Sequence, residues 1–311
     1  MFEYISYIMK KTGFSVDAMA YYQNLLAKQK EEDFRFLEMT QKEYFMEYSK
    51  DETLVNQSVE QKLKAYAELK HFDIYGFSML FLLYCSERLK KIYQEKGYSD
   101  TLFFDLMKDL SSKNEECRQV KGEWGTFVFP WFHRHYLCTR FALGRFQYET
   151  IAFDRNYCFG NIKLTPGKTV YNLHIPSLGP LTEEIRKESY QKAFYFYGFQ
   201  KAELMPIVCH SWILYPENEY IFDKTSNLYK FFHDFHIIAS GICENAFPNA
   251  WRVFNTDFNG NTNSLPQNTS LQKNIVHWLN SGKKIGDGYG ILLFDGEKIV
   301  NTSTRERGDT I

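Results

Sequence analysis

The stretch from Val170 to Leu214 constrains the fold more than any other part of this 311-residue sequence. Two short β-rich runs, Val170 to Pro176 and Leu204 to Leu214, lie at its ends. Between them are a turn-forming loop, Ser177 to Leu181, and an amphipathic helix that begins at Thr182. A strand, a crossover helix and a second strand form a parallel pair with a right-handed connection. Because ligands of such units bind at the carboxyl ends of the strands, the stretch also predicts where a site lies.

Composition places the chain among ordinary globular proteins. Hydrophobic residues make up 44% of it and charged residues 24%, which allows a packed core. The length suggests about two domains. Lys and Arg number 37 against 38 for Asp and Glu, and no long basic run is present. We therefore expect no nucleic-acid partner, because a phosphate backbone is bound by an excess of positive charge.

Targeting and redox signals predict a cytoplasmic protein. The first residues carry an acid before the first base and no small-residue cleavage pattern, so we expect no signal peptide. The longest apolar run, near Phe77 to Cys85, is far shorter than the ~20 residues that a bilayer needs, so we expect no membrane partner. The cysteines lack a CxxC spacing, which argues against a zinc ribbon or a redox pair and favours reduced thiols. They are Cys85, Cys117, Cys138, Cys158, Cys209 and Cys243.

Helical spacing dominates the first part of the chain, and residues 1–140 predict a helical N-terminal domain. The tetrads Thr40-Gln-Lys-Glu43 and Ser58-Val-Glu-Gln61 match the capping box and predict two helix starts. Gly97 suits the position after a helix end. The apolar segment Trp131 to Leu143 predicts a buried helix at the domain junction.

Strand and turn patterns dominate after Gly144, and residues 141–311 predict a second domain with one mixed sheet and helices on it. The expected fold class is therefore α+β, and the first three strands of the sheet are expected to form an antiparallel meander. The strands are expected at Arg145–Phe153, Cys158–Leu164, Val170–Ile175, Leu204–Leu214, Trp251–Asn255 and Tyr289–Phe294. The helices are expected to begin at Thr182, at Ser226 (ending at Gly241) and at Leu271.

The loop Ser177 to Thr182 is a candidate anion site, because it leads into a helix whose first N–H groups and dipole favour a phosphate. Against this, Pro176 and Pro180 lack an N–H donor. Glu183 and Glu184, in the first helical turn, would repel an anion. An ordinary strand-to-helix turn explains the loop equally well.

Histidines and one glutamate are the candidate bases. His210 lies between Cys209 and Ser211, and strand alternation puts it on the opposite face from both, so it activates neither. His174 ends the preceding strand and is expected near His210 if the two strands splay. Glu149, in the first long strand of the sheet, is a further candidate. The alternative for each is a structural role, as a hydrogen-bonded histidine or a solvated carboxylate.

Two other motifs favour structural interpretations. His133 and His135 face different sides of a helix and have no third ligand in view, so we expect no metal. The run Gly286-Asp-Gly-Tyr-Gly290 follows a helix and opens a strand, the reverse of a dinucleotide fingerprint, and predicts a turn. Asn227 and Tyr229 lie in the first turn of a helix, where surface and capping roles are usual.

Four segments in this order, ALGRFQYE, VYNLHIPSLGPLT, VCHSWIL and SNLYKFF, resemble bacterial acyltransferase-domain proteins. These have a helical N-terminal acyltransferase domain and a GNAT-like C-terminal domain. The resemblance implies direct transfer of an acyl group from acetyl-CoA or another acyl-CoA to an amine, without a metal. The chain departs from the wider GNAT pattern because HIPSLGPLT replaces the Gln/Arg-x-x-Gly-x-Gly/Ala loop that cradles the pyrophosphate.

The resemblance also implies roles for residues. A base would deprotonate the amine, with His210 ranked before His174 and Glu149, and Tyr229 would protonate the leaving thiolate. An N–H near Ile175 or Ser177 would bind the thioester oxyanion. The implied cofactor-binding residues are Ile175, Ser177, Gly179, Leu181, Thr182 and Asn227.

Two alternatives stay open at this point. The first is that the fold is kept as a ligand- or protein-binding module without catalysis, which the missing glycine loop favours. The second is a hydrolase that uses Ser211 or Cys209 with a remote histidine. For the acyltransferase, the acceptor is expected to be a small-molecule or peptide amine, and the sequence does not give the oligomeric state.

Overall fold

The computed structural model describes residues 2–45, 52–242 and 245–301. The chain divides into two compact units. The first comprises Met1–Ala142 together with Pro176–Leu178, and the second comprises Leu143–Ile175 and Gly179–Ile311. The fold is α+β, with a helical N-terminal region followed by a mixed sheet flanked by helices.

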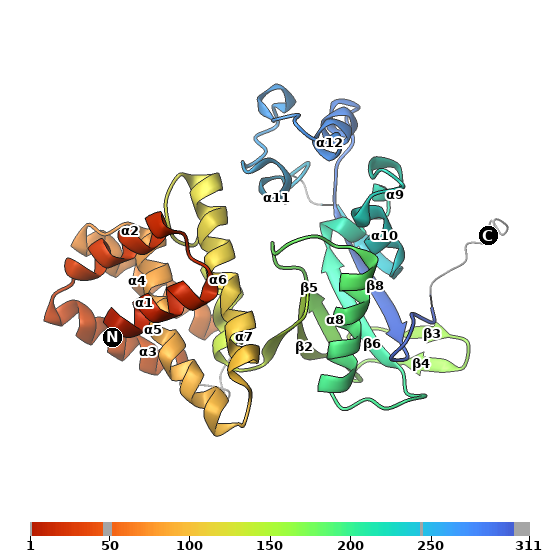
Figure 1. Ribbon diagram of the computed structural model, residues 1–311. Coiled ribbons are helices and arrows are strands. Elements are labelled where there is room, and N and C mark those ends of the chain that lie inside the picture. The colour runs from red at the N-terminus through yellow and green to blue at the C-terminus, as the bar shows by residue number, and fades with distance from the viewer. Residues whose placement is uncertain (1, 46–51, 243–244, 302–311) are drawn as a thin grey trace. The chain divides into compact units, whose positions relative to one another are not determined.

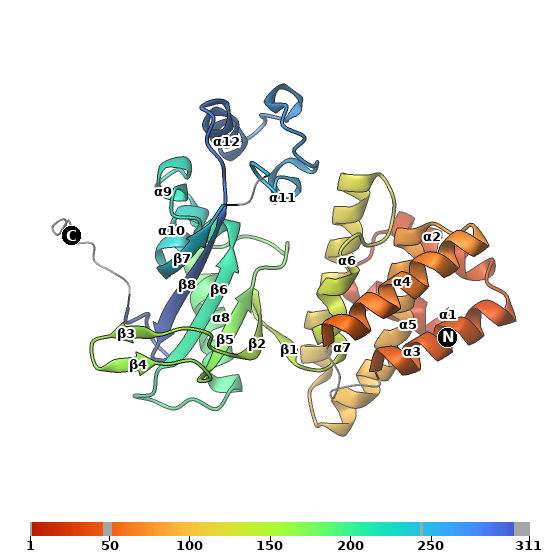
Figure 2. The same ribbon diagram turned by 180° about the vertical axis from the view of Figure 1, so that it is seen from behind.

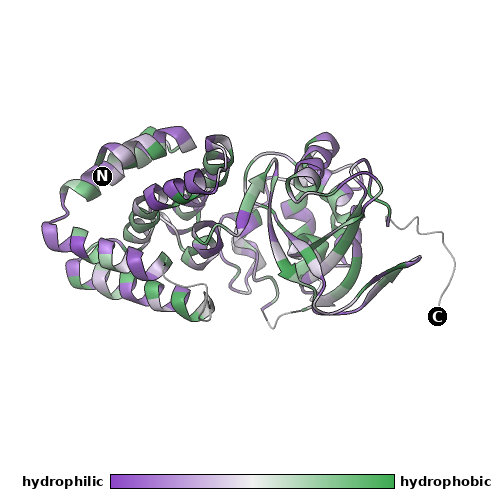
Figure 3. Ribbon diagram, turned by 90° about the horizontal axis from the view of Figure 1, so that it is seen from below, coloured by the Kyte–Doolittle hydropathy of each residue, from purple (hydrophilic) through white to green (hydrophobic). Residues whose placement is uncertain are grey.

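The first unit is built from helices, several of which carry apolar and polar residues together, as Figure 3 shows by hydropathy. They are α1 (Phe2–Thr12), α2 (Val16–Ala27), α3 (Glu31–Phe45), α4 (Glu52–Lys70), α5 (Ile74–Glu95), α6 (Asp100–Lys121), the 3-10 turn η1 (Phe129–Phe132) and α7 (His133–Tyr136). The central element is α5, which packs against α1, α3, α4, α6 and α7 (Figure 1).

Aromatic side chains fill much of this helical core. Phe77 of α5 is fully buried and stacks on Tyr66 of α4, with 5.8 Å between the ring centres. Tyr66 in turn stacks on Phe36 of α3 at 3.7 Å. Stacked and edge-on aromatic pairs add about 0.5–1.5 kcal/mol each beyond their buried area. This packing accounts for part of the aromatic content of the sequence.

The helix starts differ from two of the predicted ones. Thr40 lies inside α3 and Ser58 inside α4, so both capping-box predictions were wrong. Ser15 and Ser99 cap α2 and α6 instead, each accepting a backbone N–H three residues on. A capping tetrad also occurs inside amphipathic helices, where tertiary packing decides the boundaries. The prediction for Gly97 is confirmed, since it follows the end of α5 with φ of 74°.

The predicted helix over Trp131–Leu143 was also wrong. This segment contains the end of η1, the single turn α7 and strand β1 (Arg140–Leu143). Cys138 has a left-handed φ of 56°, which ends the turn before the strand begins.

The second unit holds a six-stranded sheet in the order β1-β2-β5-β6-β8-β7, with β3 and β4 as a separate hairpin (Figures 1 and 2). β5 and β6 are parallel, and β2–β5, β6–β8 and β7–β8 are antiparallel. The remaining strands are β2 (Phe146–Ala152), β3 (Tyr157–Phe159), β4 (Ile162–Leu164), β5 (Thr169–His174), β6 (Met205–Ser211), β7 (His236–Gly241) and β8 (Asp287–Phe294).

The two faces of this sheet are covered differently. Helices α8 (Glu183–Phe196) and α10 (Asn227–His233) lie on one face, where Phe146 packs against Tyr190 of α8 and Phe231 of α10. On the other face, Val170 and Val208 form a core with residues of the β3–β4 hairpin. The other short elements are η2 (Trp212–Leu214), α9 (Asn218–Ile221), α11 (Trp251–Phe254), η3 (Thr262–Ser264) and α12 (Ser270–Asn280).

The strand–helix–strand prediction over Val170–Leu214 is confirmed as β5, α8 and β6. The antiparallel meander was wrong, because β2 pairs directly with β5 while the segment between them forms the β3–β4 hairpin. Trp251–Asn255 is the helix α11 rather than a strand. The helix from Ser226 ends at His233, so that β7 occupies the segment up to Gly241.

In the run Gly286 to Gly290, the residues from Asp287 onward form the start of β8 rather than a turn. Gly288 pairs with Ser211 and Gly290 with Cys209 across the sheet. A Cβ atom at Gly288 would collide with the carbonyl oxygen of Leu214. The glycines therefore allow β8 to pass close to η2.

No helix in the described residues is long and apolar enough to cross a membrane. Five of the six cysteines are free thiols in the structure, and the sixth, Cys243, lies outside the described residues.

Candidate active site

The candidate site lies where the central parallel strands end. The ladder between β5 and β6 consists of Tyr171 opposite Ile207 and Asn172 opposite Val208. β5 continues to His174 and β6 to Ser211 without further pairing to each other. The open ends leave backbone groups available between the strands, as a ligand site at the end of a parallel pair requires.

A polar cluster occupies the sheet face at β2 and β5. Cross-strand register places Glu149 of β2 opposite Asn172 of β5. His174 Nε2 lies 2.7 Å from Glu149 Oε1, and Asn172 Nδ2 donates to the same oxygen at 3.0 Å. Glu149 is only 3% exposed, so these contacts compensate a buried carboxylate. The structure thus brings together two of the predicted bases, and it adds Asn172.

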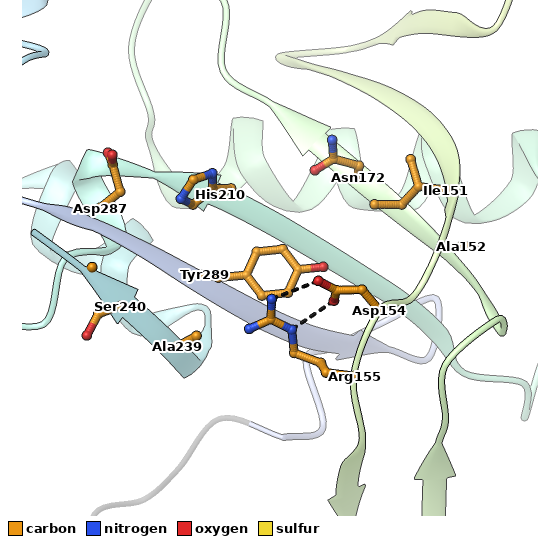
Figure 4. Close-up of a pocket in the computed structure, with 11 residues that line it drawn as sticks. Ile151, Ala152, Asp154, Arg155, Asn172, His210, Ala239, Ser240, Asp287 and Tyr289 are labelled. Carbon is orange, nitrogen blue, oxygen red and sulfur yellow. Dashed lines mark hydrogen bonds and ion pairs between the residues drawn. The ribbon is translucent and has the colours of Figure 1, made fainter. Parts of the chain in front are cut away.

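A cavity of about 440 Å³ opens on the same sheet face, and His210 lines it (Figure 4). Asn172 also lines this cavity, so it connects the polar cluster to the cavity. In the described part of the chain, the His210 ring has no hydrogen-bond partner, and the residue is exposed. Its imidazole is therefore accessible to a ligand in the cavity.

One wall of the cavity is formed by residues that carry no recognisable signal in the sequence. Tyr289 of β8 lies opposite His210 in the ladder, with 6.3 Å between the ring centres. The Arg155 guanidinium lies 4.4 Å from the centre of the Tyr289 ring and binds Asp154 at 2.8 and 2.9 Å (Figure 4). Burial, with the Asp154 charge second, raises the pKa of Tyr289 to about 12, so its phenol stays neutral. Asp287 lies at another side of the same cavity.

A second cavity of the unit, of about 470 Å³, lies along α8 and α10 on the helix side of the sheet. Four exposed lysines line this groove, and none forms a salt bridge with a described residue. The groove also contains the buried ion pair of Arg186 with Asp234, at 2.6 Å. The four lysines are Lys187, Lys224, Lys230 and Lys298.

The loop between β5 and α8 does not present the free N–H groups that an anion-binding helix start would offer. The Thr182 side chain does not cap α8. Backbone and Thr182 hydrogen bonds hold the pKa of Glu184 below its usual value, so an acid already occupies the helix start. Arg145 donates to the carbonyl oxygens of Gly179 and Pro180, at 3.1 and 3.0 Å. A guanidinium therefore supplies positive charge where the sequence offered few N–H donors.

The other predicted cofactor-binding residues are spread over this region. Ile175 is half-buried just beyond β5, and Leu181 is buried and accepts from Arg186 through its carbonyl oxygen. Ser177 clusters with the first unit, where its hydroxyl donates to Glu116. Asn227 is exposed at the first position of α10.

Tyr229 lines the groove on the helix side rather than the cavity with His210. Its hydroxyl donates to Glu219 at 2.9 Å, and its ring packs edge-on against His233. Its backbone N–H is capped by Ser226, which confirms the predicted helix start.

The nucleophiles of the hydrolase alternative lack a histidine partner. Cys209 is buried, and burial raises the pKa of its thiol. The Ser211 hydroxyl accepts from the Ile213 N–H at 3.2 Å. Neither side chain contacts a histidine in the part of the chain that the structure describes. A thiol that is protonated and enclosed is a poor nucleophile.

His135 forms a buried contact with Asp109 and is not part of a metal site. Its Nε2 lies 3.3 Å from Asp109 Oδ2, which also accepts from the Trp131 indole at 2.6 Å. Across the described ranges, no group of three or more His, Cys, Asp or Glu side chains is arranged to hold a metal ion.

Two family models match the chain almost end to end. The N-acyltransferase N-terminal domain matches residues 5–138, and the GNAT-like C-terminal domain matches residues 141–292. The chain therefore carries an N-acyltransferase N-terminal domain followed by a GNAT-like C-terminal domain. The resemblance noted in the sequence is therefore confirmed. No curated protein gives a significant match.

Solved acyltransferase structures share the fold of this chain. An acyltransferase in complex with decanoyl-CoA is 17% identical, with a TM-score of 0.65 over 91% of this chain and 85% of that chain. An acyltransferase with decanoyl-CoA and teicoplanin is also 17% identical, with a TM-score of 0.59 over 93% and 99%. An acyltransferase with CoA and 10C-teicoplanin is 16% identical, with a TM-score of 0.56 over 92% and 98%.

Proposed function

We propose that this protein is an acyl-CoA-dependent N-acyltransferase that acts on an amine of a small molecule. The observation that carries the proposal is the accessible His210 in a cavity beside the open ends of β5 and β6. The family models, and the acyl-CoA complexes of proteins with the same fold, support the class of reaction. Teicoplanin, a glycopeptide present in two of those complexes, supports an acceptor of small-molecule size.

The reaction needs a base because most amines are protonated at neutral pH. An amine of lysine-like pKa is neutral in only about one molecule in a few thousand at pH 7. His210 would take the amine proton as the nitrogen attacks the thioester carbon. The C–N bond forms, the C–S bond breaks, and the thiolate of CoA leaves with a proton. A positioned base of this kind contributes about 10²–10⁴ in rate.

His174 and Glu149 have a different place in this scheme. Glu149 Oε1 already contacts His174 at 2.7 Å and accepts a hydrogen bond from Asn172. We therefore propose that Glu149 and His174 hold the end of β5 in position rather than act as the base. The N–H groups near Ile175 would then face the thioester oxyanion, where one aimed donor is worth about 10²–10³ in rate. Tyr229 stays a predicted proton donor to the thiolate.

We place the polyanionic end of CoA in the groove along α8 and α10, where the four lysines outnumber the two exposed acids of the lining, Glu183 and Glu297. CoA carries a pyrophosphate and a 3′-phosphate, and the four lysines supply positive charge from three segments of the chain. Arg145 adds a guanidinium at the loop before α8. Side-chain cations would thus replace the missing backbone cradle. The acyl donor and the acceptor would approach from opposite faces of the sheet and meet between β5 and β6.

The test combines binding with product detection. Isothermal titration should show saturable binding of decanoyl-CoA or acetyl-CoA, and mass spectrometry should show N-acylated product from a panel of small amines. No binding of either thioester well above a millimolar would overturn the proposal. Binding without product from any amine would support the non-catalytic alternative.

A further inference from the structure

A third cavity, of about 620 Å³, lies wholly within the helical first unit and has no part in the proposed acyl transfer. It is bounded by α4, the start of α5, the end of α6 and the segment leading into η1. Its volume falls in the range of small-molecule pockets, about 300–1,000 Å³. The aromatic residues that line it are Phe72, Tyr75, Phe127 and Phe129.

Two buried residues that carry a hydroxyl group, Ser78 and Thr126, lie in the lining. Ser78 is 3% exposed, and its side chain has no hydrogen-bond partner in the described ranges. A helical serine usually bonds back to the preceding turn, and this one does not. Thr126 is 2% exposed and accepts from the Val128 N–H at 3.2 Å, which leaves its own proton to donate. Both hydroxyl protons are therefore available to donate to an acceptor bound in the cavity.

The charges around the cavity favour a ligand with acceptor groups. Both acids of the lining are already engaged: Glu60 pairs with Lys64 at 3.3 Å, and Asp73 accepts from the Gly76 N–H at 2.5 Å as the cap of α5. The Lys121 ammonium lies 5.2 Å from the centre of the Phe127 ring. The lining thus combines hydroxyl donors and a cation with aromatic faces.

We propose that this cavity binds an aryl carboxylate. The aromatic ring would lie among Phe72, Tyr75 and Phe127, and the carboxylate would accept hydrogen bonds from Ser78 and Thr126 near Lys121. Flat aromatic walls favour a planar ring over a flexible acyl chain, because stacked ring pairs gain energy beyond area burial. The proposal is independent of the acyltransferase reaction, since all of its residues lie in the first unit.

Isothermal titration of the full chain with 2-naphthoate tests the site, with 2-naphthalenemethanol as the uncharged control. We expect saturable binding of the acid that is at least about tenfold tighter than binding of the alcohol. Ser78→Ala and Lys121→Met should each weaken binding by about tenfold, since a bond to a charged group is worth ~1.5–3 kcal/mol. Lys96→Met, at the exposed far end of α5, should leave it unchanged.

Three results would overturn the proposal. They are no saturable binding of 2-naphthoate up to several millimolar, equal binding of acid and alcohol, and unchanged binding in both cavity variants. Circular dichroism confirms that each variant is folded. Because the titration needs no thioester, its failure leaves the proposed acyl transfer untouched, and saturating decanoyl-CoA should not displace the naphthoate.

Discussion

His210 is the side chain on which the proposed chemistry depends most directly. It lines the cavity beside the ends of β5 and β6 and is free of hydrogen bonds to described residues. We expect His210→Ala to lower kcat by about 10²–10³, because it removes the base without altering the CoA groove. Steady-state kinetics with the best amine of the panel measures this effect, and titration with decanoyl-CoA should give an unchanged Kd.

The matched control for this prediction is His277→Ala, which removes an exposed histidine from α12 of the same unit. It should leave kcat unchanged. If His210→Ala kept more than about a third of the activity, the base would have to be sought in the Glu149–His174 pair.

Replacing Glu149 tests its contribution to the stability of the fold rather than to catalysis. Its buried carboxylate receives the bond from Asn172 and contacts His174. Glu149→Ala should destabilise the fold by about 1–3 kcal/mol, because it leaves buried polar groups without their acceptor. Glu149→Gln should recover most of that loss, since its amide oxygen can accept the same bonds. Urea unfolding of the three proteins checks the order, and a Gln variant as unstable as the Ala variant would contradict it.

Single residues of the candidate site could be predicted from the sequence, but which of them lie next to each other across the sheet could not. Alternation placed His210 on the face opposite Cys209, and the ladder agrees, since these residues pair with Tyr289 and Gly290. That Glu149 lies opposite Asn172 depends on the register between β2 and β5, which are separated in sequence by the β3–β4 hairpin. Register across such a gap is set by packing of the whole face rather than by local spacing.

At the scale of elements, β8 shows how a local pattern misleads. Its glycine run looks like a turn, although Gly288 is a strand residue that lies against the Leu214 carbonyl. We expect Gly288→Ala to destabilise the protein by about 1–3 kcal/mol or more, because a Cβ there requires a backbone shift. Gly241→Ala on the adjacent strand is the control, since its Cβ would meet no atom within 4 Å. Equal thermal stability of the two variants would refute this account of the run.

Removing lysines from the groove along α8 and α10 tests whether this groove binds CoA. We expect the double variant Lys187→Met/Lys230→Met to weaken CoA binding by about tenfold or more and to flatten its salt dependence, since exposed charges are screened by salt. Binding of 3′-dephospho-CoA should change less if one of the lysines contacts the 3′-phosphate. Titrations at two salt concentrations measure both effects. Lys192→Met, whose ammonium pairs with Glu188 on α8, is the control and should bind as the unchanged protein does.

At the scale of the whole molecule, composition and periodicity were sufficient for the fold class. A helical half and a mixed-sheet half follow from the change of pattern near Gly144, and the parallel β5–α8–β6 unit follows from the order of its segments. The cavities did not follow from the pattern. Glu60, Ser78 and Phe127 lie far apart in the sequence, and only the packing of α4, α5 and the segment before η1 brings them to one cavity.

The two proposed ligands should therefore protect different parts of the chain. Hydrogen exchange with decanoyl-CoA should slow amides in the second unit, around the start of α8 and in α10, because the groove and the open strand ends lie there. With 2-naphthoate, slowing should concentrate at the start of α5 and in residues 126–129 of the first unit. A ligand in 100-fold excess over its Kd adds about 2.7 kcal/mol of stability, enough to be resolved by exchange rates. Protection of the same peptides by both ligands would mean that they share one site, and the cavity in the helical unit would then not be the binding site for the aryl carboxylate.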